Sequence, residues 1–262
     1  MRPIGIVGIP FDQKSTFMTG AAEGPASIRK VLTNGSSNFW TESGNELKEG
    51  IHYKDTGDII VQDYLIDIES NIDKRLQNYS NLITLGGDHS IAYPIIKSFS
   101  KKYPDLNILQ LDAHTDLYPE FEGDPYSHAC PFRRIMEEGF AKKLTQIGIR
   151  NIPAEHQAFA EQHNIEILTM RNLFSGKRPL FEGPLYISLD LDVFDPGFVP
   201  GVSHHEPGGM SPRDALELIL DINVEIVGAD IVELNPKRDL HGMTAMVAAK
   251  FLKELIGKIA FT

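Results

Sequence analysis

Short, continuous runs of apolar residues alternate along this chain with segments that have the pattern of helices. Unbroken apolar runs are typical of parallel strands buried on both faces, whereas half-exposed strands alternate apolar and polar residues. We therefore predict an α/β fold, a three-layer sandwich in which helices cover both faces of a parallel sheet. The predicted strands are residues 4–9, 59–61, 82–85, 107–111, 144–149, 165–168, 185–191 and 226–232.

The segments between these runs carry helix signals. Ser211 is a favourable N-cap, Pro212 suits the first helical position, and Asp214 places an acidic side chain in the first turn. With 262 residues, 42% of them hydrophobic, the chain is long enough to bury a full core, and no repeat or linker divides it. We therefore predict one domain over residues 1–262. The predicted helices are residues 25–32, 64–78, 90–101, 131–138, 154–163, 212–220 and 244–258.

Charge and cysteine content narrow the function classes. The net charge of -11 argues against nucleic acid or an anionic membrane as a partner and is compatible with a small cationic ligand. Cys130 is the single cysteine, which excludes an internal disulfide framework and a thiolate zinc site and suits a reducing compartment. The apolar run at 4–9 is too short for a signal peptide, and no run approaches a membrane span. We predict a cytoplasmic protein without nucleic-acid or membrane partners.

Three of the predicted strands end in side chains that bind metals. Residues just past the carboxyl ends of strands in an open parallel sheet line one crevice, so side chains from several strands can meet there. One such Asp or His alone is more often a cap or a solvated loop residue, but six in this arrangement favour a metal site. The six are His89 after the strand at 82–85, Asp112, His114 and Asp116 after the strand at 107–111, and Asp190 and Asp192 around the end of the strand at 185–191.

The chemistry of these six side chains favours two divalent ions. Four carboxylates in one crevice repel each other unless positive charge lies among them, and two divalent ions balance four carboxylates. The donors are oxygen and imidazole without sulfur, so Mn²⁺ fits best, while Fe²⁺, Co²⁺ and Zn²⁺ stay open. A pair of ions lowers the pKa of a shared water toward neutrality and so provides a hydrolytic nucleophile.

Three residues are candidate catalytic groups. Glu233 follows the strand at 226–232 and lies on the same sheet edge, where it can pair with a cationic substrate group; a surface position is the alternative. His128 follows a long loop and can carry protons, because its ordinary pKa is near neutrality; a plain loop residue is the alternative. We include Asp116 among the catalytic groups as well as among the metal ligands.

Other polar residues near these motifs have simpler explanations. Asp88 either supports the neighbouring His89 or belongs to a turn. Cys130 is interpreted as a packed thiol rather than a nucleophile. His204 and His205 are adjacent in an extended segment and therefore point in opposite directions, so we predict the rim of a loop rather than a third metal site.

The order and spacing of the motifs resemble those of the ureohydrolases, a family that includes arginase, agmatinase, guanidinobutyrase and formimidoylglutamase. The sequences Gly-Gly-Asp-His-Ser at 86–90, Asp-Ala-His-Thr-Asp at 112–116 and Ser-Leu-Asp-Leu-Asp-Val-Phe-Asp-Pro at 188–196 resemble the three signatures of that family. The segments at 24–29, 206–209 and 230–236 extend the resemblance over nearly the whole chain.

This resemblance implies a parallel eight-stranded sheet, a pair of Mn²⁺ ions and hydrolysis of a guanidino or formimino carbon, usually with release of urea. It also implies that Glu233 holds the guanidinium, that His128 transfers protons, and that the protein is a homotrimer or homohexamer. Asp112 and Asp190 would bridge the ions. The implied ligand sets are His89, Asp112, Asp116 and Asp190 for one ion, and Asp112, His114, Asp190 and Asp192 for the other.

Within the family, the loop before His128 favours agmatinase. Arginases carry Ser-Gly-Asn in this loop, whereas this chain has Asp-Pro-Tyr-Ser at 124–127, and the segment at 126–134 resembles the agmatinase version. Glu120, Glu122 and Asp124 make the loop acidic, which suits a substrate with a free amine at its far end. We therefore predict hydrolysis of agmatine to putrescine and urea.

Alternatives to agmatine stay open at this point. Met18 and Ala22 stand where many agmatinases have arginine. Arginine, guanidinobutyrate or formimidoylglutamate are other candidate substrates, and Arg133 and Arg134 are candidate partners for a substrate carboxylate. A homologue that binds metal without catalysis and acts as a regulatory subunit is the alternative from another function class, although all six ligands and both candidate catalytic partners are present.

Overall fold

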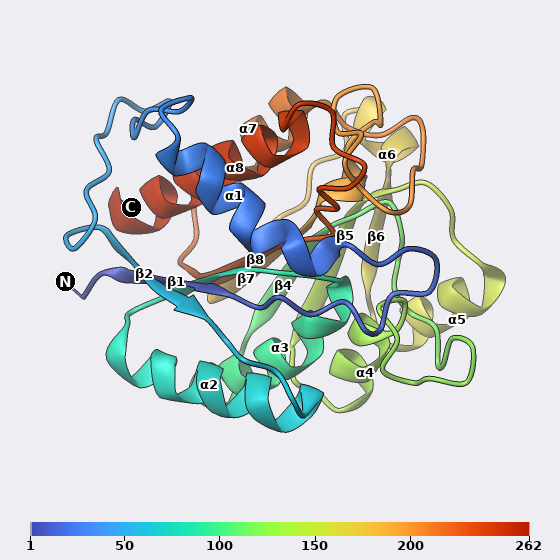
Figure 1. The fold of residues 1–262 in the computed structure, drawn as a ribbon. Coiled ribbons are helices and arrows are strands. Elements are labelled where there is room, and N and C mark those ends of the chain that lie inside the picture. The colour runs from blue at the N-terminus through green and yellow to red at the C-terminus, as the bar shows by residue number, and fades with distance from the viewer. Residues whose placement is uncertain (1, 262) are drawn as a thin grey trace.

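The computed structural model describes residues 2–261 and contains one eight-stranded sheet in which all paired strands are parallel. The strand order is β2-β1-β3-β8-β7-β4-β5-β6 (Figure 1). This sheet, with helices on both faces, confirms the predicted fold. The strands are β1 Ile4–Gly8, β2 Tyr53–Asp58, β3 Leu82–Leu85, β4 Asn107–Leu111, β5 Lys143–Ile149, β6 Glu166–Thr169, β7 Leu185–Asp190 and β8 Ile226–Val232.

Two hydrophobic layers separate the sheet from its helices. One layer contains buried residues of α1, α7 and α8, and the other contains buried residues of α2, α3, α4 and α5 (Figure 1). The helices are α1 Gly24–Thr33, α2 Tyr64–Asn78, α3 Ala92–Lys102, α4 Pro131–Glu137, α5 Ala154–Gln162, α6 Met170–Phe174, α7 Pro212–Leu220 and α8 Met243–Phe261. Three short 3-10 helices are η1 Ala21–Glu23, η2 His89–Ile91 and η3 Leu191–Val193.

The second strand corrects the sequence prediction. The prediction of a strand at 59–61 is wrong, because β2 occupies the preceding residues Tyr53–Asp58 and Ile60 is 81% exposed. β2 lies at the edge of the sheet beside β1 alone, and most of its side chains are at least partly exposed. An exposed edge strand does not need the apolar run by which buried strands are recognised. The five-residue helix α6 was not predicted either, since it is too short to show a helical period.

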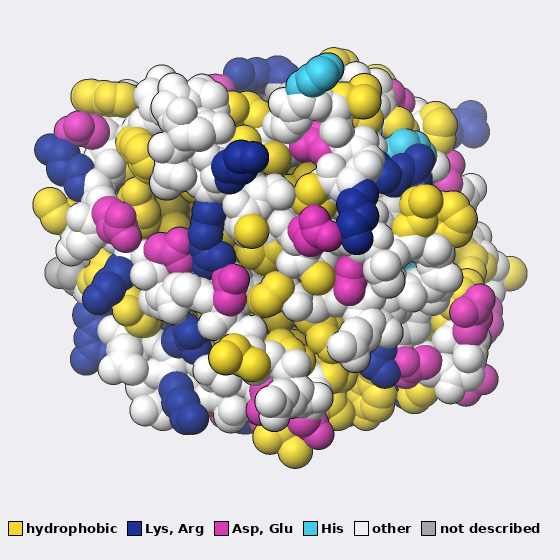
Figure 2. Space-filling view, viewed as in Figure 1, with side chains coloured by type: hydrophobic (Ala, Val, Ile, Leu, Met, Phe, Trp, Pro, Cys, Tyr) yellow, Lys and Arg dark blue, Asp and Glu magenta, His cyan; other side chains and the backbone are white. Residues whose placement is uncertain are grey.

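The helix boundaries agree more closely with the prediction. Helix α7 begins at Pro212 after the N-cap Ser211, whose side chain accepts a hydrogen bond from the backbone N–H of Asp214. Within residues 2–261 we find no helix with the length and apolar character that a membrane crossing requires. On the face in Figure 2, acidic and basic side chains are interspersed with apolar ones rather than gathered by sign.

The four central strands bring the candidate site residues together. β3, β8, β7 and β4 are neighbours in that order, and each ends at or just before a candidate residue. The loop after β3 packs tightly, because the Asp88 N–H donates to the carbonyl oxygen of Phe11 at 2.9 Å. A Cβ atom at Gly87 would lie 1.7 Å from that same oxygen, so only glycine permits this approach. The close contact fixes the start of η2, which carries His89.

Candidate metal centre

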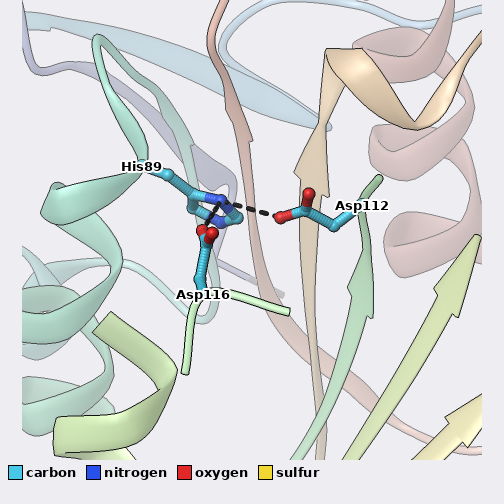
Figure 3. A group of neighbouring side chains, drawn as sticks. All are labelled: His89, Asp112 and Asp116. Atoms are coloured by element: carbon cyan, nitrogen blue, oxygen red, sulfur yellow. Dashed lines mark ion pairs between the residues drawn. The ribbon is translucent and has the colours of Figure 1, made fainter. Parts of the chain in front are cut away.

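His89 lies among three carboxylates, two of which, Asp112 and Asp116, are drawn in Figure 3. Its Nδ1 atom is 3.1 Å from Asp112 Oδ2, 3.0 Å from Asp116 Oδ2 and 3.2 Å from Asp190 Oδ2. All four residues are buried. One nitrogen surrounded by three carboxylate oxygens, away from water, is an arrangement that a cation among these atoms would stabilise.

A second group of ligand atoms adjoins the first. His114 Nδ1 lies 2.9 Å from Asp192 Oδ2 and 3.8 Å from Asp112 Oδ1. Asp112 therefore belongs to both groups, with one oxygen toward His89 and the other toward His114. In each group of three, the ligand atoms lie within 4.8 Å of one another. A carboxylate shared between two groups has the position of a bridging ligand.

The spacing of the motifs at 112–116 and 190–192 explains how the carboxylates of Asp112 and Asp190 are oriented toward His89. Asp112 Oδ1 accepts the backbone N–H of His114 at 2.7 Å, and Asp190 Oδ1 accepts that of Asp192 at 2.8 Å. Each aspartate thus closes a local turn with one oxygen and directs the other toward His89. The backbone of Asp116 takes the left-handed conformation with φ of 51°, an uncommon conformation for a residue other than glycine.

The pKa values reflect crowded negative charge. Burial, followed by the charges of Asp116 and Asp192, raises the pKa of Asp112 to about 7. Burial and the same kind of repulsion hold the pKa of Asp190 well above its usual range. Burial lowers the pKa of His114, but the Asp192 carboxylate outweighs it and the pKa rises to about 11. Buried carboxylates that repel one another would be stabilised by cations among them, and oxygen and imidazole donors fit divalent cations.

A buried chain of hydrogen bonds supports His89 from behind. Ser188 Oγ donates to Asp230 Oδ1 at 2.8 Å, and Tyr186 OH donates to Asp230 Oδ2 at 2.9 Å. The single hydroxyl proton of Ser188 is thereby used, so its oxygen accepts the Nε2 proton of His89 at 2.9 Å. This tautomer leaves the His89 Nδ1 lone pair facing the carboxylates, as a metal ligand requires.

Ser188 and Asp230 were not predicted to belong to the site, although they begin the motifs at 188–196 and 230–236. The available signal was Asp230 itself, a charged residue in the otherwise apolar strand β8. Gln110 and Gln146 were also missed. Gln146 Nε2 donates to Gln110 Oε1 at 2.6 Å, and Gln110 Nε2 donates to Asp112 Oδ2 at 2.7 Å. Both amides are buried, so Gln110 on β4 contacts the candidate ligand directly and Gln146 on the neighbouring strand β5 supports Gln110.

Glu233 and His128 are in direct contact. Glu233 Oε1 accepts the backbone N–H of His89 at 2.9 Å and lies 3.0 Å from His128 Nδ1. Thr16 Oγ1 lies 3.0 Å from the other ring nitrogen of His128. Burial opposes a charged His128, yet the contact with Glu233 outweighs it and raises the pKa of His128 to about 9. The prediction placed these two residues near the site separately, and the structure joins them as a pair.

A pocket of about 310 Å³ opens beside these groups. Its lining includes side chains of both ligand groups together with residues that the sequence did not indicate. Among the latter is His156, whose buried Nδ1 lies 2.6 Å from Thr115 Oγ1 and whose Nε2 has no protein partner among the described residues. The lining residues are Thr16, His114, Thr115, Asp116, Tyr118, Phe121, His128, Ala129, Asn151, Pro153, His156, Asp190, Asp192, His204, Glu206 and Glu233.

The two adjacent histidines form part of the pocket rim. His204 lies over the pocket, with its ring centroid 5.3 Å from that of His128 and 6.2 Å from that of His114. His205 lines an outer recess beside His204, and its Nε2 lies 2.7 Å from the carbonyl oxygen of Pro200. Neither belongs to a metal-ligand group found among the described residues.

Of the three acidic loop residues, one faces the site. Asp124 forms an ion pair with Lys14 at 2.6 Å, and Glu120 is exposed. Glu122 lines an outer recess that adjoins the pocket.

Cys130 is buried, and burial followed by the charge of Asp116 raises the pKa of its thiol to about 12, as expected for a packed thiol.

Arg133 and Arg134, the two arginines considered as partners for a substrate carboxylate, form ion pairs within their own helix. Arg133 Nε lies 2.8 Å and Arg134 Nη2 lies 2.7 Å from the carboxylate of Glu137 on their own helix α4.

Asp88 caps η2, since its side chain accepts the backbone N–H of Ser90 at 3.2 Å.

Buried carboxylates and imidazoles at the carboxyl edge of a parallel sheet define an α/β protein with a candidate metal centre. The family model described as the Arginase family matches residues 2–257. This chain therefore belongs to the arginase family and is a hydrolase of the ureohydrolase type.

Individual relatives agree with this membership. "Arginase 1, mitochondrial" of Arabidopsis thaliana is 44% identical over 276 residues, which cover 97% of this chain and 80% of the relative. "Agmatinase" of Bacillus anthracis is 35% identical over 262 residues, with 96% and 90% coverage. The solved structure "Arginase from Medicago truncatula" superposes with a TM-score of 0.92 at 38% identity, over 98% of this chain and 87% of that chain.

Proposed function

We propose that the protein hydrolyses the guanidino group of a small cationic substrate at a pair of Mn²⁺ ions. The observation that carries this proposal is the convergence of three carboxylate oxygens on His89 Nδ1, beside a second group that shares Asp112. Bound divalent ions supply a water of lowered pKa that acts as a nucleophile near neutral pH. The residues proposed to hold the ions are His89, Asp112, His114, Asp116, Asp190 and Asp192.

Glu233 has the properties of a substrate-binding group. Its carboxylate is 4% exposed, lines the pocket, and keeps a lowered pKa because the His128 contact outweighs burial. A buried, ionised carboxylate binds a planar guanidinium through charge-assisted hydrogen bonds. We propose that Glu233 holds the substrate guanidinium beside the ligand groups, with the carbon to be attacked turned toward them.

His128 is proposed to supply a proton to the leaving group. Hydrolysis adds water at the guanidino carbon and breaks its bond to the alkyl nitrogen, so urea forms and the amine must gain a proton. With a pKa of about 9, His128 carries a proton at neutral pH. Its position on the pocket lining, 3.0 Å from Glu233, places that proton beside the proposed guanidinium site. Asp116 remains a proposed ligand on the same wall.

For the substrate, we propose arginine ahead of agmatine. The preference for agmatine rested on the loop sequence before His128 and on three acidic loop residues, but of these three only Glu122 lines the recess, where Arg238 is also present. The relative named arginase is 44% identical, and the relative named agmatinase is 35% identical. Agmatine remains the second candidate, because the loop before His128 lacks the Ser-Gly-Asn stretch expected of arginases.

A product-release assay with Mn²⁺-loaded protein tests this function. We expect urea from arginine, less from agmatine, and little product from guanidinobutyrate or formimidoylglutamate. Glu233→Gln should reduce kcat/KM by ~100-fold or more, since a buried charged partner of the substrate is lost. Glu120→Gln is the matched control and should retain activity, because Glu120 is exposed outside the pocket lining. Absence of product from all four compounds would favour the regulatory homologue instead.

The assembly and the cellular location are further parts of the proposal. The family resemblance supports a homotrimer or homohexamer, which the molar mass measured by light scattering would test. The acidic net charge and the single buried cysteine support the cytoplasm and the absence of nucleic-acid partners. The printed name of the Arabidopsis thaliana relative gives that protein a mitochondrial location. Fractionation of the native cell would decide between the two compartments.

A further inference from the structure

The pocket continues outward into a second hollow of about 590 Å³, here called the outer recess. Thr16, His114, Phe121, His204 and Glu206 line both hollows, so the two are continuous. A substrate whose guanidinium lies beside Glu233 can therefore reach the outer recess with its far end. The outer recess is where substrates that differ only at that end can be distinguished.

Arg238 is the one Lys or Arg among the described residues that line these two hollows. None of the ion pairs found within residues 2–261 includes it, whereas its neighbour Lys237 pairs with Glu23 at 3.1 Å. Arg133 and Arg134 are likewise paired, with Glu137. A guanidinium without a carboxylate partner, on the wall of a substrate pocket, is available to a substrate carboxylate.

Uncharged contacts hold Arg238 in place. Its Nη1 donates to the carbonyl oxygen of Ser203 at 2.7 Å, and its Nη2 lies 3.1 Å from His205 Nδ1. Arginine can only donate, so His205 Nδ1 accepts and the His205 Nε2 proton is donated to the Pro200 carbonyl oxygen at 2.7 Å. Nη1 also lies 3.7 Å from the sulfur of Met18. These contacts orient the guanidinium without neutralising its charge, and Nε has no hydrogen-bond partner found among the described residues.

Glu122 presents the opposite charge from another loop. It lies in a tight turn in which the backbone N–H groups of Phe121 and Asp124 each donate to the other's carbonyl oxygen, at 3.1 and 3.0 Å. The central residues Glu122 and Gly123 have φ of 52° and 80°, which is typical of a rigid type I′ turn. Glu122 forms no ion pair among those found within residues 2–261.

The outer recess therefore presents a cation and an anion that do not neutralise each other. Glu206 adds a second carboxylate to the same wall. A ligand end that matches this pattern carries both a carboxylate and an ammonium, as the α-amino-acid end of arginine does. The free amine of agmatine would use the acidic side alone.

We propose that Arg238 is a specificity-determining residue that binds the substrate α-carboxylate, while Glu122 accepts the α-ammonium. This inference rests on the proposed guanidino hydrolysis and names the group that selects an amino-acid substrate. It assigns the selection to the segment after β8 and to the turn at 121–124, rather than to the arginines of α4.

The test compares arginine with agmatine in Arg238→Gln. The variant should lower kcat/KM for arginine by about tenfold or more, mainly through KM, and leave agmatine within about twofold of wild type. Arg238→Lys should recover part of the arginine activity, since it restores the charge without the planar fork. Lys237→Gln is the matched control, because it removes an adjacent charge outside the recess lining and should change neither substrate.

Product binding provides a second measurement that does not need turnover. By calorimetry on Mn²⁺-loaded protein, Arg238→Gln should weaken ornithine by about tenfold and leave putrescine unchanged. Equal losses for both substrates would overturn the inference, because Arg238 would then only support Ser203 and His205. Unchanged arginine kinetics would overturn it as well. If the wild type turns over neither substrate but Arg238→Gln still weakens ornithine binding selectively, the proposed function is contradicted and the inferred binding site is kept.

Discussion

Ser188→Ala tests whether the hydrogen-bond chain behind His89 prepares it to bind metal. Ser188 is fully buried and links the Nε2 proton of His89 to the carboxylate of Asp230. A hydrogen bond to a charged group contributes about 1.5–3 kcal/mol. Because Tyr186 still donates to the other oxygen of Asp230, we expect the free energy of unfolding of the metal-free protein to fall by about 2 kcal/mol.

The same substitution should also weaken metal binding. Without Ser188, the His89 ring is free to rotate or to change tautomer, and loss of such a supporting partner lowers metal affinity by roughly 10- to 100-fold. Denaturant unfolding of metal-free protein measures the first effect, and calorimetric titration with Mn²⁺ measures the second. Together they separate a contribution to folding from a contribution to the metal centre.

Ser98→Ala is the matched control. Ser98 is 1% exposed and donates to the carbonyl oxygen of Glu69 at 3.2 Å, in the interface between α2 and α3. This control should lose about 1 kcal/mol of stability while its Mn²⁺ affinity stays unchanged. If Ser188→Ala binds Mn²⁺ as tightly as Ser98→Ala does, the proposed role of the chain behind His89 is refuted.

Two further predictions concern charged pairs. His128→Asn should lower kcat by about 100-fold and keep full Mn²⁺ content, because the ring is proposed to carry a proton without binding the ions; loss of metal would place it among the ligands. Glu42→Gln should cost at most about 1 kcal/mol at pH 7, since its partners Arg213 and Lys250 are exposed or half-exposed. The Arg213 contact lowers the Glu42 pKa from 4.5 to about 2, so this contribution is present above pH 4.5 and is lost as the pH falls through about 2. A stability difference from wild type that does not shrink as the pH falls from 4.5 through 2 would contradict this.

The fold could be predicted because the central strands are buried on both faces. Leu82–Leu85 and Asn107–Leu111 were located from their apolar runs alone. The edge strand Tyr53–Asp58 was missed because exposure relaxes that requirement. The candidate ligands were predictable for a related reason, since they follow strands whose carboxyl ends meet at one edge of the sheet.

Contacts that depend on strand register or on distant loops could not be predicted in this way. Ser188 reaches Asp230 because the two residues are paired across β7 and β8, and the register of these strands is not visible in either segment. Lys14 neutralises Asp124 from 110 residues away, so the loop seemed more acidic in sequence than it is in the structure. Arg238 had no motif to mark it, because its significance comes only from the recess that it lines.

The number of Mn²⁺ ions bound per chain at saturation tests directly whether the site holds a pair of ions. Equilibrium dialysis of wild-type protein against Mn²⁺, followed by elemental analysis, gives this number. Asp112, Asp116 and Asp192 are buried in two ligand groups that share Asp112, and the buried Asp190 adjoins them at His89, so two divalent ions would balance the four carboxylates. We expect a stoichiometry of two. Saturation at one ion per chain would contradict the two-ion centre and the hydrolysis that depends on it.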